Sequence, residues 1–390
     1  MIARRQPRID TARPVILAGV DALTPAGWAT DTSLVLQDGY IRSLGGGHPD
    51  AEVIDASGLF ALPGIIDVHG DAVERCLAPR QGVAMPDHVA LAEHDAMVLS
   101  AGITTTFISL TDGIEPGIRN RATIRRLMPL LTDPSFGARH RLHLRHETCA
   151  SAGLDELIEW LDAGSIHLLS IADHVPEAGD HVQLERFAAS VNRRDGGNPE
   201  SIVRLAKDAA LERADGRRVD AVLAAAARMR GVPLASHDDA DESAVRDSLA
   251  RGSAICEFPM TLAAARAAAA GGATVLAGAP NLVRGASHLG LLSAAVGISA
   301  GVIDCLCSDY HPASLFHAPF VAAERGVLSL AHAWRLVSAN PAAAVGIGHR
   351  AGALSEGYDA DFVLVEPPVA GRARLRAVYV GGRAVLRSDP

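Results

Sequence analysis

The sequence predicts a (β/α)8 barrel with a small β-sandwich domain built from both ends of the chain. The interior, about residues 61–350, alternates short apolar runs with alanine-rich stretches of helical character. Parallel strands are buried on both faces and therefore read as continuous apolar runs. Several of these runs end in histidine or carboxylate side chains. Because the carboxyl ends of barrel strands converge on one mouth, the pattern predicts a polar site there.

Both ends of the chain read as short strands and turns. Apolar runs separated by turn residues fill about residues 15–60 and return near the carboxyl terminus, and Gln37-Asp38-Gly39 is a hairpin signal. Strand-rich segments at both termini most simply form one domain, and the 390 residues leave room for a barrel of about 250 residues beside it. We expect a split β-sandwich domain over 1–60 and 351–390 and a barrel domain over 61–350.

Composition excludes several classes of protein. The formal net charge of −9 disfavours a nucleic-acid binder. The longest alanine-rich run, Leu262 to Ala270, is too short to cross a membrane, and Met1 to Arg5 are not followed by the apolar region of a secretory signal. Five cysteines without CxxC spacing favour a reducing cytoplasm over a disulfide framework. We expect a cytoplasmic protein without membrane or nucleic-acid partners, and a homodimer as the commonest symmetric assembly.

His69 and Asp71 are the first candidate metal ligands. They follow the apolar run that begins at Pro63-Gly64. One residue separates them, so on an extended strand both side chains point to the same face, where an imidazole and a carboxylate can hold one cation. The structural alternative is a histidine hydrogen-bonded to a neighbouring aspartate.

Glu147 is the second candidate. It ends an apolar run and shares a strand face with His143 and Arg145. A carboxylate can bridge two metal ions with its two oxygens, a task that many binuclear hydrolases give to a carboxylated lysine. The only lysine, Lys207, lies in a charged helical stretch away from any strand end, so the bridge is expected at Glu147. A salt bridge with Arg145 is the alternative.

Three further residues complete the candidate set. His174 and His237 end their own apolar runs, where the fifth and sixth barrel strands would end, and are the natural pair for a second metal. Asp309 follows the last apolar strand, where it can bind one metal and accept a proton as the catalytic base, or simply cap a helix. Imidazoles and carboxylates gathered at one mouth are the ligands of a hydrolytic divalent-metal site. We expect one or two ions, zinc first, with manganese or iron also compatible.

Candidate substrate contacts lie beside these ligands. Arg80 stands in the loop after the first metal strand and could pair a phosphate through both edges of its guanidinium. Arg145 and His311 neighbour the proposed ligands and could contact substrate, support the ligands or lie on the surface.

The order His-x-Asp, Glu, His, His, Asp, together with a split terminal β-domain, resembles the amidohydrolase superfamily. More specific stretches resemble one branch, the PhnM-type diphosphatases of phosphonate metabolism in the bacterial carbon–phosphorus lyase pathway. The chain departs from that branch at Gly70, Ala72 and the tract 174–180, without losing a proposed ligand. The stretches that carry the resemblance are His69-Gly70-Asp71, Ala78 to Val83, Ala101 to Phe107, His143 to Glu147, Asp173 to Pro176, Ala235 to Asp239 and Ser308 to Leu315.

The resemblance implies metal-dependent hydrolysis of α-D-ribose 1-methylphosphonate 5-triphosphate to 5-phospho-α-D-ribose 1-methylphosphonate and pyrophosphate. A small phosphorylated ribose is then the expected partner. A metal-activated water would attack the phosphorus nearest the ribose, Asp309 would take its proton and Arg80 could hold the polyphosphate. An amidohydrolase acting on a cyclic amide or N-acyl substrate is the first alternative, and it needs fewer arginines at the site. The second alternative is a non-catalytic metal-binding scaffold. The loss of one or more of the metal-ligating residues would favour it.

Overall fold

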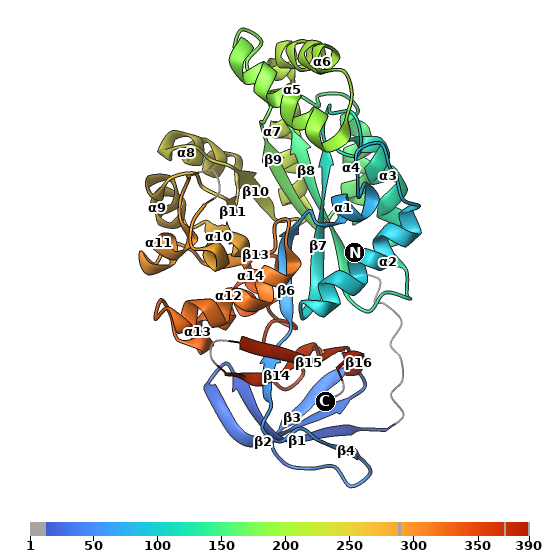
Figure 1. Ribbon diagram of the computed structural model, residues 1–390, viewed down its shortest axis with the longest axis vertical. Helices are drawn as coiled ribbons and strands as arrows, with labels where there is room; N and C mark the ends of the chain where they lie inside the picture. The colour runs from blue at the N-terminus through green and yellow to red at the C-terminus, as the bar shows by residue number, and fades with distance from the viewer. Residues whose placement is uncertain (1–12, 288–289, 370–371, 389–390) are drawn as a thin grey trace.

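The computed structural model describes residues 13–287, 290–369 and 372–388 (Figure 1). The predicted barrel is confirmed as eight parallel strands in one sheet, each beside its predecessor in the chain. The sheet closes from last strand to first through a single bridge between Gly70 and Asp309, so closure occurs at the candidate metal site. The barrel strands are β6 (Ile65–Gly70), β7 (Ile103–Asp112), β8 (Arg139–Glu147), β9 (Leu168–Ala172), β10 (Leu234–His237), β11 (Ile255–Glu257), β12 (Thr274–Gly278) and β13 (Cys305–Cys307).

The strand-rich segments at both ends of the chain form a separate eight-stranded sheet, as the predicted fold class requires. Its strands are β1 (Val15–Thr24), β2 (Gly27–Gln37), β3 (Tyr40–Leu44), β4 (Glu52–Asp55), β5 (Phe60–Pro63), β14 (Phe362–Val369), β15 (Arg372–Val380) and β16 (Arg383–Arg387). The order is β16-β15-β14-β5-β1-β2-β3, with β4 beside β1. Antiparallel pairing of β5 with β14 joins the two ends of the chain. The predicted hairpin is present, since Asp38 and Gly39 between β2 and β3 both have positive φ, at 53° and 84°. Residues 1–12, 370–371 and 389–390 of the expected domain lie outside the described residues. They include Met1 to Arg5, where no secretory signal is expected.

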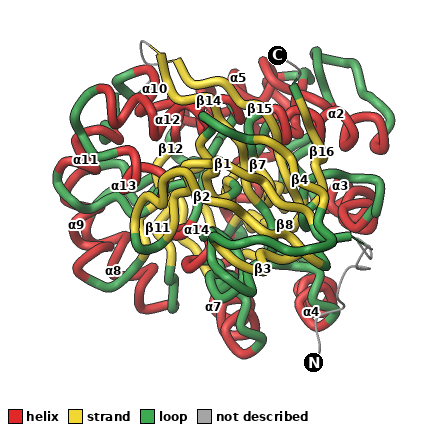
Figure 2. Tube along the Cα trace, turned by 90° about the horizontal axis from the view of Figure 1, so that it is seen from below, coloured by secondary structure: helices red, strands yellow, loops and turns green. Residues whose placement is uncertain are grey.

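Helices surround the barrel, and the terminal sheet lies across one end of it (Figure 2). The helices are α1 (Val73–Leu77), α2 (Asp87–Ser100), α3 (Arg121–Leu127), α4 (Leu154–Asp162), α5 (His181–Asp195), α6 (Pro199–Leu211), α7 (Arg213–Met229), α8 (Glu242–Arg251), α9 (Leu262–Ala270), α10 (Ala279–Arg284), α11 (Ala294–Ser299), α12 (Pro312–Glu324), α13 (Leu330–Arg335) and α14 (Ala339–Ala344), with the short 3-10 helix η1 (Met128–Thr132) after α3. Within the described ranges, none of these helices combines the length and the apolar character needed to span a bilayer.

The barrel interior is a packed core away from the mouth. Buried side chains such as Val68, Phe107, Leu168 and Ile255 form one cluster, and α14 packs onto it. Cys305 and Cys307 belong to this cluster and pack in the core. All five cysteines are free and buried. A filled interior leaves the mouth as the place for chemistry.

The terminal domain is fastened to the end of the barrel opposite the strand carboxyl ends. Arg139, the first residue of β8, donates to both carboxylate oxygens of Asp361 at 2.8 and 3.1 Å. Trp334 donates from its indole nitrogen to the carbonyl of Pro63 at 2.9 Å. These contacts connect the sheet to the scaffold without approaching the mouth.

Three helices, α5 to α7, occupy the connection between β9 and β10. Helices α5 and α6 project beyond the barrel at the top of Figure 1. The Asp180 side chain caps α5 by accepting from the backbone N–H of Gln183 at 3.0 Å, and Gly196 ends the helix at φ 81°. Leu184 and Ala206 join a small buried cluster that packs the two helices together. Helices α5 and α6 are therefore stabilised by their own buried cluster, and they lie beside the mouth of the barrel.

The order of the strands corrects one detail of the sequence interpretation. His174 follows the fourth barrel strand, β9, and His237 ends the fifth, β10, rather than the fifth and sixth. The sixth strand, β11, ends in Glu257, which sequence reasoning passed over.

Candidate active site

Three barrel strands turn sharply at the mouth through residues with positive φ. Asp238, Phe258 and Asp309 follow β10, β11 and β13 with φ of 56°, 54° and 53°. This conformation costs a residue other than glycine on the order of 1–3 kcal/mol, and aspartate tolerates it better than a bulky aromatic side chain does. Such a cost at the ends of three barrel strands, two of them adjacent, indicates a geometry held for function.

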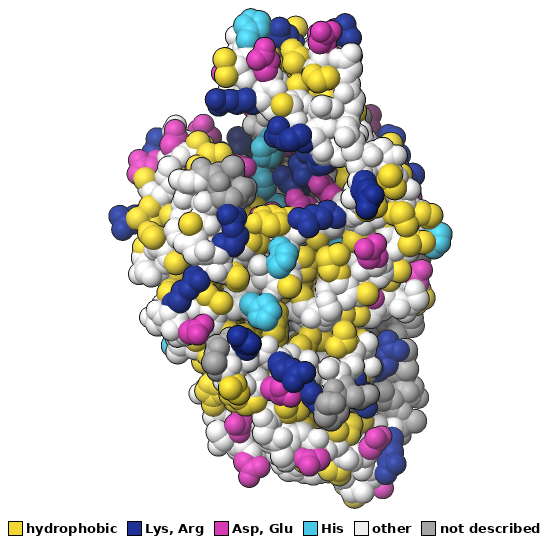
Figure 3. All heavy atoms as spheres, viewed as in Figure 1, with side chains coloured by type: hydrophobic (Ala, Val, Ile, Leu, Met, Phe, Trp, Pro, Cys, Tyr) yellow, Lys and Arg dark blue, Asp and Glu magenta, His cyan; other side chains and the backbone are white. Residues whose placement is uncertain are grey.

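A cavity of about 370 Å³ opens where these strands end. Ligand pockets typically occupy roughly 300–1,000 Å³. Figure 3 shows histidine, arginine and acidic side chains gathered in the hollow beneath the α5–α6 projection. Of the residues predicted from sequence, the cavity brings together His69, Asp71, Arg145, His174, His237 and Asp309.

The remaining predicted residues lie elsewhere. Glu147 does not line the cavity but contacts His174, which does. Arg80 is exposed, in a turn closed by a bridge to Val83, and His311 is exposed at the start of α12, with Nδ1 2.8 Å from the hydroxyl of Ser314. Neither Arg80 nor His311 lines the cavity in this structure, and their contact with substrate stays a prediction.

Glu257 lies beneath the metal-ligand candidates and faces two of them. Its Oε1 is 3.1 Å from Nδ1 of His69, and its Oε2 is 3.1 Å from Nδ1 of His237. The two imidazole rings stack with centroids 5.2 Å apart and planes 14° apart, and Phe258 packs edge-on against both. With Nδ1 of each ring turned to the same carboxylate, Nε2 is left for a ligand on the other side.

Burial keeps these two imidazoles neutral. It lowers the pKa of His69 to about 3 and the pKa of His237 well below its usual value. Burial also raises the pKa of Glu257 to about 7, although His143 and Arg145 nearby oppose the shift. Neutral imidazole is the form that binds a metal ion.

The donor set fits a divalent cation. Two groups of three side chains, His69–His237–Glu257 and His174–His237–Asp238, each bring potential ligand atoms within 4.8 Å of one another. The buried atoms Nδ1 of His69 and Oε1 of Glu257 also lack a hydrogen-bond partner among the described residues. Nε2 of His237 is contacted at 3.1 Å by the guanidinium of Arg145, a positive charge where a cation would sit. Nitrogen and oxygen donors in this arrangement are those of zinc, manganese or iron sites.

His174 and Glu147 form a close ion pair in this structure. Nδ1 of His174 lies 2.6 Å from Glu147, which also accepts from the backbone N–H of His174 at 3.0 Å. Burial alone would lower the pKa of His174, but Glu147 and the contact with Asp238 raise it to about 10. Burial alone would raise the pKa of Glu147, but its contacts with His174 lower it to about 2. A cation that binds His174 must displace this proton.

Asp309 is placed by the seam that closes the barrel. Its backbone N–H donates to the carbonyl of His69 at 3.0 Å, and its carbonyl accepts from the N–H of Asp71 at 3.0 Å. Buried Asp67 holds the preceding residue, Ser308, through its backbone N–H at 2.9 Å and its hydroxyl at 2.6 Å. Burial, then the neighbouring Asp71 carboxylate, raise the pKa of Asp309 to about 7, which suits a group that exchanges protons near neutral pH.

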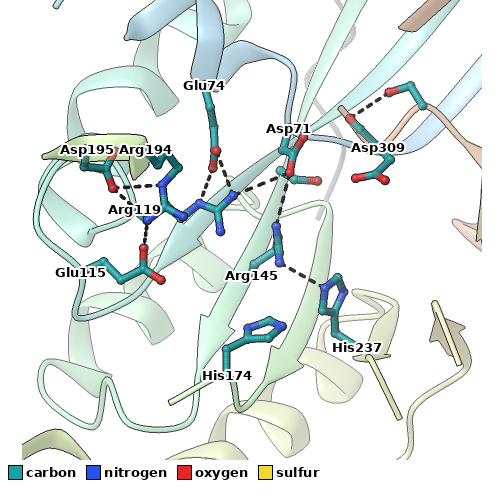
Figure 4. Close-up of polar contacts among 12 residues, drawn as sticks. Asp71, Glu74, Glu115, Arg119, Arg145, His174, Arg194, Asp195, His237 and Asp309 are labelled. Carbon is teal, nitrogen blue, oxygen red and sulfur yellow. Dashed lines mark hydrogen bonds and ion pairs between the residues drawn. The ribbon is translucent and has the colours of Figure 1, made fainter. Parts of the chain in front are cut away.

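Three arginines also reach the cavity: Arg145 from β8, Arg119 from the loop after β7, and Arg194 from α5 (Figure 4). Arg145 is 5% exposed, and its Nε has no hydrogen-bond partner among the described residues. Its nearest carboxylate, Asp71, is 3.9 Å away. A buried guanidinium so loosely compensated favours an anionic ligand.

Comparison with known proteins agrees with the geometry. Residues 219–385 match the model described as Amidohydrolase family. The α-D-ribose 1-methylphosphonate 5-triphosphate diphosphatase of Escherichia coli K12 is 34% identical over 341 residues, which cover 85% of this chain and 90% of that protein. The chain belongs to the amidohydrolase superfamily, in the branch of this diphosphatase.

Solved structures share the fold of this amidohydrolase. A D-hydantoinase aligns with a TM-score of 0.66 at 15% identity, over 96% of this chain and 95% of that one. A putative prolidase from Bifidobacterium longum gives 0.63 at 17% identity, over 98% and 96%. The N-acetylglucosamine-6-phosphate deacetylase of Pasteurella multocida gives 0.60 at 11% identity, over 95% and 99%. At these identities the likeness concerns the fold alone.

Sequence reasoning missed three functional candidates of this amidohydrolase. Glu257 ends the short apolar run Ile255-Cys256-Glu257, so it carries the same signal as the ligands that were found. Arg119 and Arg194 carried no comparable signal, because one lies in a loop and the other on an ordinary helix face.

Proposed function

We propose that this hydrolase is a metal-dependent diphosphatase. It converts α-D-ribose 1-methylphosphonate 5-triphosphate and water to 5-phospho-α-D-ribose 1-methylphosphonate and pyrophosphate. The observation that carries the proposal is one cavity in which a histidine and carboxylate cluster adjoins three arginines, Arg119, Arg145 and Arg194. The Escherichia coli relative, named for this reaction, supports the substrate.

The residues proposed to hold metal are His69, Asp71, Glu147, His174, His237 and Asp309. A divalent cation held there supplies a Lewis acid and lowers the pKa of a bound water. Asp309 accepts the proton of the attacking water, and the position of its carboxylate is set by the β13–β6 seam. In the protein without a bound cation, burial and the neighbouring Asp71 carboxylate raise the pKa of Asp309 to about 7.

The bond changes follow from this placement. The water oxygen forms a bond to the phosphorus attached to the ribose 5-oxygen, while the bond from that phosphorus to the next bridging oxygen breaks. The leaving group is pyrophosphate, whose negative charge needs stabilisation as it departs. Arginine side chains along the cavity provide this electrostatically.

A second candidate is hydrolysis of a cyclic amide or N-acyl compound. The cavity lining also includes apolar residues, among them Phe258, Pro259 and Leu292, which could take an acyl group or ring substituent. This candidate leaves the buried cation of Arg145 without a role, which is why the diphosphatase is preferred.

The test is pyrophosphate release from the ribose triphosphate by the purified protein reconstituted with Zn²⁺, Mn²⁺ or Fe²⁺. Nucleoside triphosphates and an N-acyl amino acid run in parallel. Release from the first substrate alone, abolished by a chelator, supports the proposal. Turnover of the N-acyl compound without pyrophosphate release moves the assignment to the second candidate.

Zinc as the resident metal, a cytoplasmic location and a homodimer stay predictions. Elemental analysis of protein purified without added metal identifies the ion and its number per chain. Sedimentation of the same sample gives the assembly.

A further inference from the structure

The three cavity arginines stand in a row that leads from the candidate metal ligands to helix α5. Arg145 is innermost, 3.1 Å from Nε2 of His237. Arg145 and Arg119 approach the same oxygen of Asp71, at 3.9 and 3.8 Å. Arg194 is outermost. Figure 4 shows Glu115 in contact with the guanidinium of Arg194, which lies next to Arg119. We call Arg145, Arg119 and Arg194 the arginine row.

Carboxylates behind the row hold its outer members in place. Glu74 accepts from Nε and Nη2 of Arg119 at 2.7 and 2.9 Å. Asp195 accepts from Nε and Nη2 of Arg194 at 2.9 and 2.8 Å. Neither carboxylate lines the cavity, whereas both arginines do. These contacts use Nε and Nη2 of each guanidinium, and Glu115 shares Nη2 of Arg194. Nη1 of each arginine therefore keeps its donors for a ligand.

Glu115, unlike Glu74 and Asp195, lines the cavity, as Asp71 does. It pairs with Arg194 across the mouth, from the loop after β7 to α5. Gly117 of the same loop packs so closely on Asp195 that a Cβ there would lie 2.5 Å from the carboxyl carbon. The loop after β7 and helix α5 are thus packed together. Within this contact the carboxylate of Glu115 forms an ion pair with Arg194, at a position that an anionic ligand could take.

The cavity lining also has an uncharged part. Phe258, Leu276, Leu292 and Ile303 contribute to it. The arginines among the lining residues are those of the arginine row. A linear anion that starts at the metal ligands would follow the arginine row outward.

We propose that Arg119 and Arg194 form a subsite for the two terminal phosphates of the substrate and hold them as they leave as pyrophosphate. The inference rests on the proposed function and adds the residues that recognise the leaving group. Two guanidinium groups preset by Glu74 and Asp195 match paired phosphate oxygens, and little side-chain entropy is lost on binding. Pyrophosphate displaces the carboxylate of Glu115 from Nη2 of Arg194, which opens the edge between Nη1 and Nη2 to paired phosphate oxygens.

The test is calorimetric titration of the metal-reconstituted protein with inorganic pyrophosphate, which needs no ribose substrate. Arg194→Ala removes contacts to a charged group and is expected to weaken binding about tenfold or more. Arg194→Lys, which keeps the charge but not the paired geometry, falls between that variant and the wild type. Glu115→Gln removes the competing anion and is expected to bind pyrophosphate more tightly than the wild type.

Arg193→Ala is the matched control, because Arg193 is the exposed neighbour on the same helix and does not line the cavity. Its pyrophosphate affinity and metal content should equal those of the wild type. Equal affinity of Arg194→Ala and wild type, with metal content unchanged in both, would overturn the subsite. Weaker binding by Glu115→Gln would also contradict it.

The two proposals can fail separately. Pyrophosphate binding that depends on Arg194, in a protein that releases none from the ribose triphosphate, supports the subsite and removes the assigned substrate. Pyrophosphate release with unchanged KM and product inhibition in Arg194→Ala supports the function and removes the subsite.

Discussion

Oε2 of Glu257 lies 3.1 Å from Nδ1 of His237, while Nε2 of the same ring faces the cavity beside Asp238. The other oxygen of Glu257 lies at the same distance, 3.1 Å, from Nδ1 of His69. One buried carboxylate therefore hydrogen-bonds the imidazole of His237 and lies close to the imidazole of His69 stacked on it. A carboxylate in this place fixes the ring tautomer and raises the basicity of the ligand nitrogen.

Replacing Glu257 with glutamine should weaken metal binding by roughly 10–100-fold, since the amide keeps the volume but not the charge. The measurement is metal content after dialysis against graded chelator, beside a circular dichroism spectrum that reports the fold. Turnover at saturating metal should recover in part. Wild-type metal retention by the variant would show that Glu257 only fills space.

Asp309→Asn should remove turnover and leave the fold. A positioned general base contributes roughly 10²–10⁴-fold to a rate, and the amide cannot accept the proton. The backbone bonds of Asp309 to His69 and Asp71 do not involve its side chain, so the barrel seam persists. Steady-state kcat with unchanged melting temperature is the readout, and near-normal kcat would contradict the assigned role.

Gly70 is predicted to tolerate no side chain. A Cβ there would lie 2.7 Å from the carboxylate of Asp67 and 2.9 Å from the hydroxyl of Ser308, in the bond that places Asp309. Gly70→Ala should lower the free energy of unfolding by about 1–3 kcal/mol and reduce kcat as well. Gly47→Ala, where a Cβ meets nothing within 4 Å, is the control and should stay within about 0.5 kcal/mol of wild type in chemical denaturation. Equal effects of the two substitutions would refute the packing argument.

His94, buried on α2 far from the mouth, should make the protein acid-sensitive. Burial, assisted by neighbouring His140, lowers the pKa of His94 to about 3. The unfolded chain takes up a proton near pH 6.5 and the folded chain does not, so His94 costs stability as the pH falls below 6.5. Relative to His94→Gln, the wild type should lose about 1.4 kcal/mol per pH unit between pH 6 and pH 4. Urea unfolding at stepped pH measures this difference, and parallel pH profiles would contradict it.

The sequence was informative wherever chemistry and strand position coincide. His69, His237 and Asp309 each end an apolar run, and convergence of strand ends in a barrel brings them to one cavity without further knowledge. Glu257 obeys the same rule. It was missed because its strand is only three residues long and offers little apolar signal.

Loops were less predictable. Arg80 and Arg119 both follow barrel strands, but only Arg119 lines the cavity. Its position depends on Glu74 and on the packing of Gly117 against Asp195, contacts between segments far apart in the chain. Pairing of Glu147 with His174 is likewise a tertiary result, since the spacing of the two residues does not determine it.

The measurement that tests the central claim most directly is pyrophosphate release from α-D-ribose 1-methylphosphonate 5-triphosphate, followed with and without a chelator and with metal restored. The proposed function predicts stoichiometric pyrophosphate and 5-phospho-α-D-ribose 1-methylphosphonate, lost with the chelator and regained with Zn²⁺, Mn²⁺ or Fe²⁺. Full activity in the chelated protein, or no pyrophosphate from the protein loaded with each of the three metals, would contradict it.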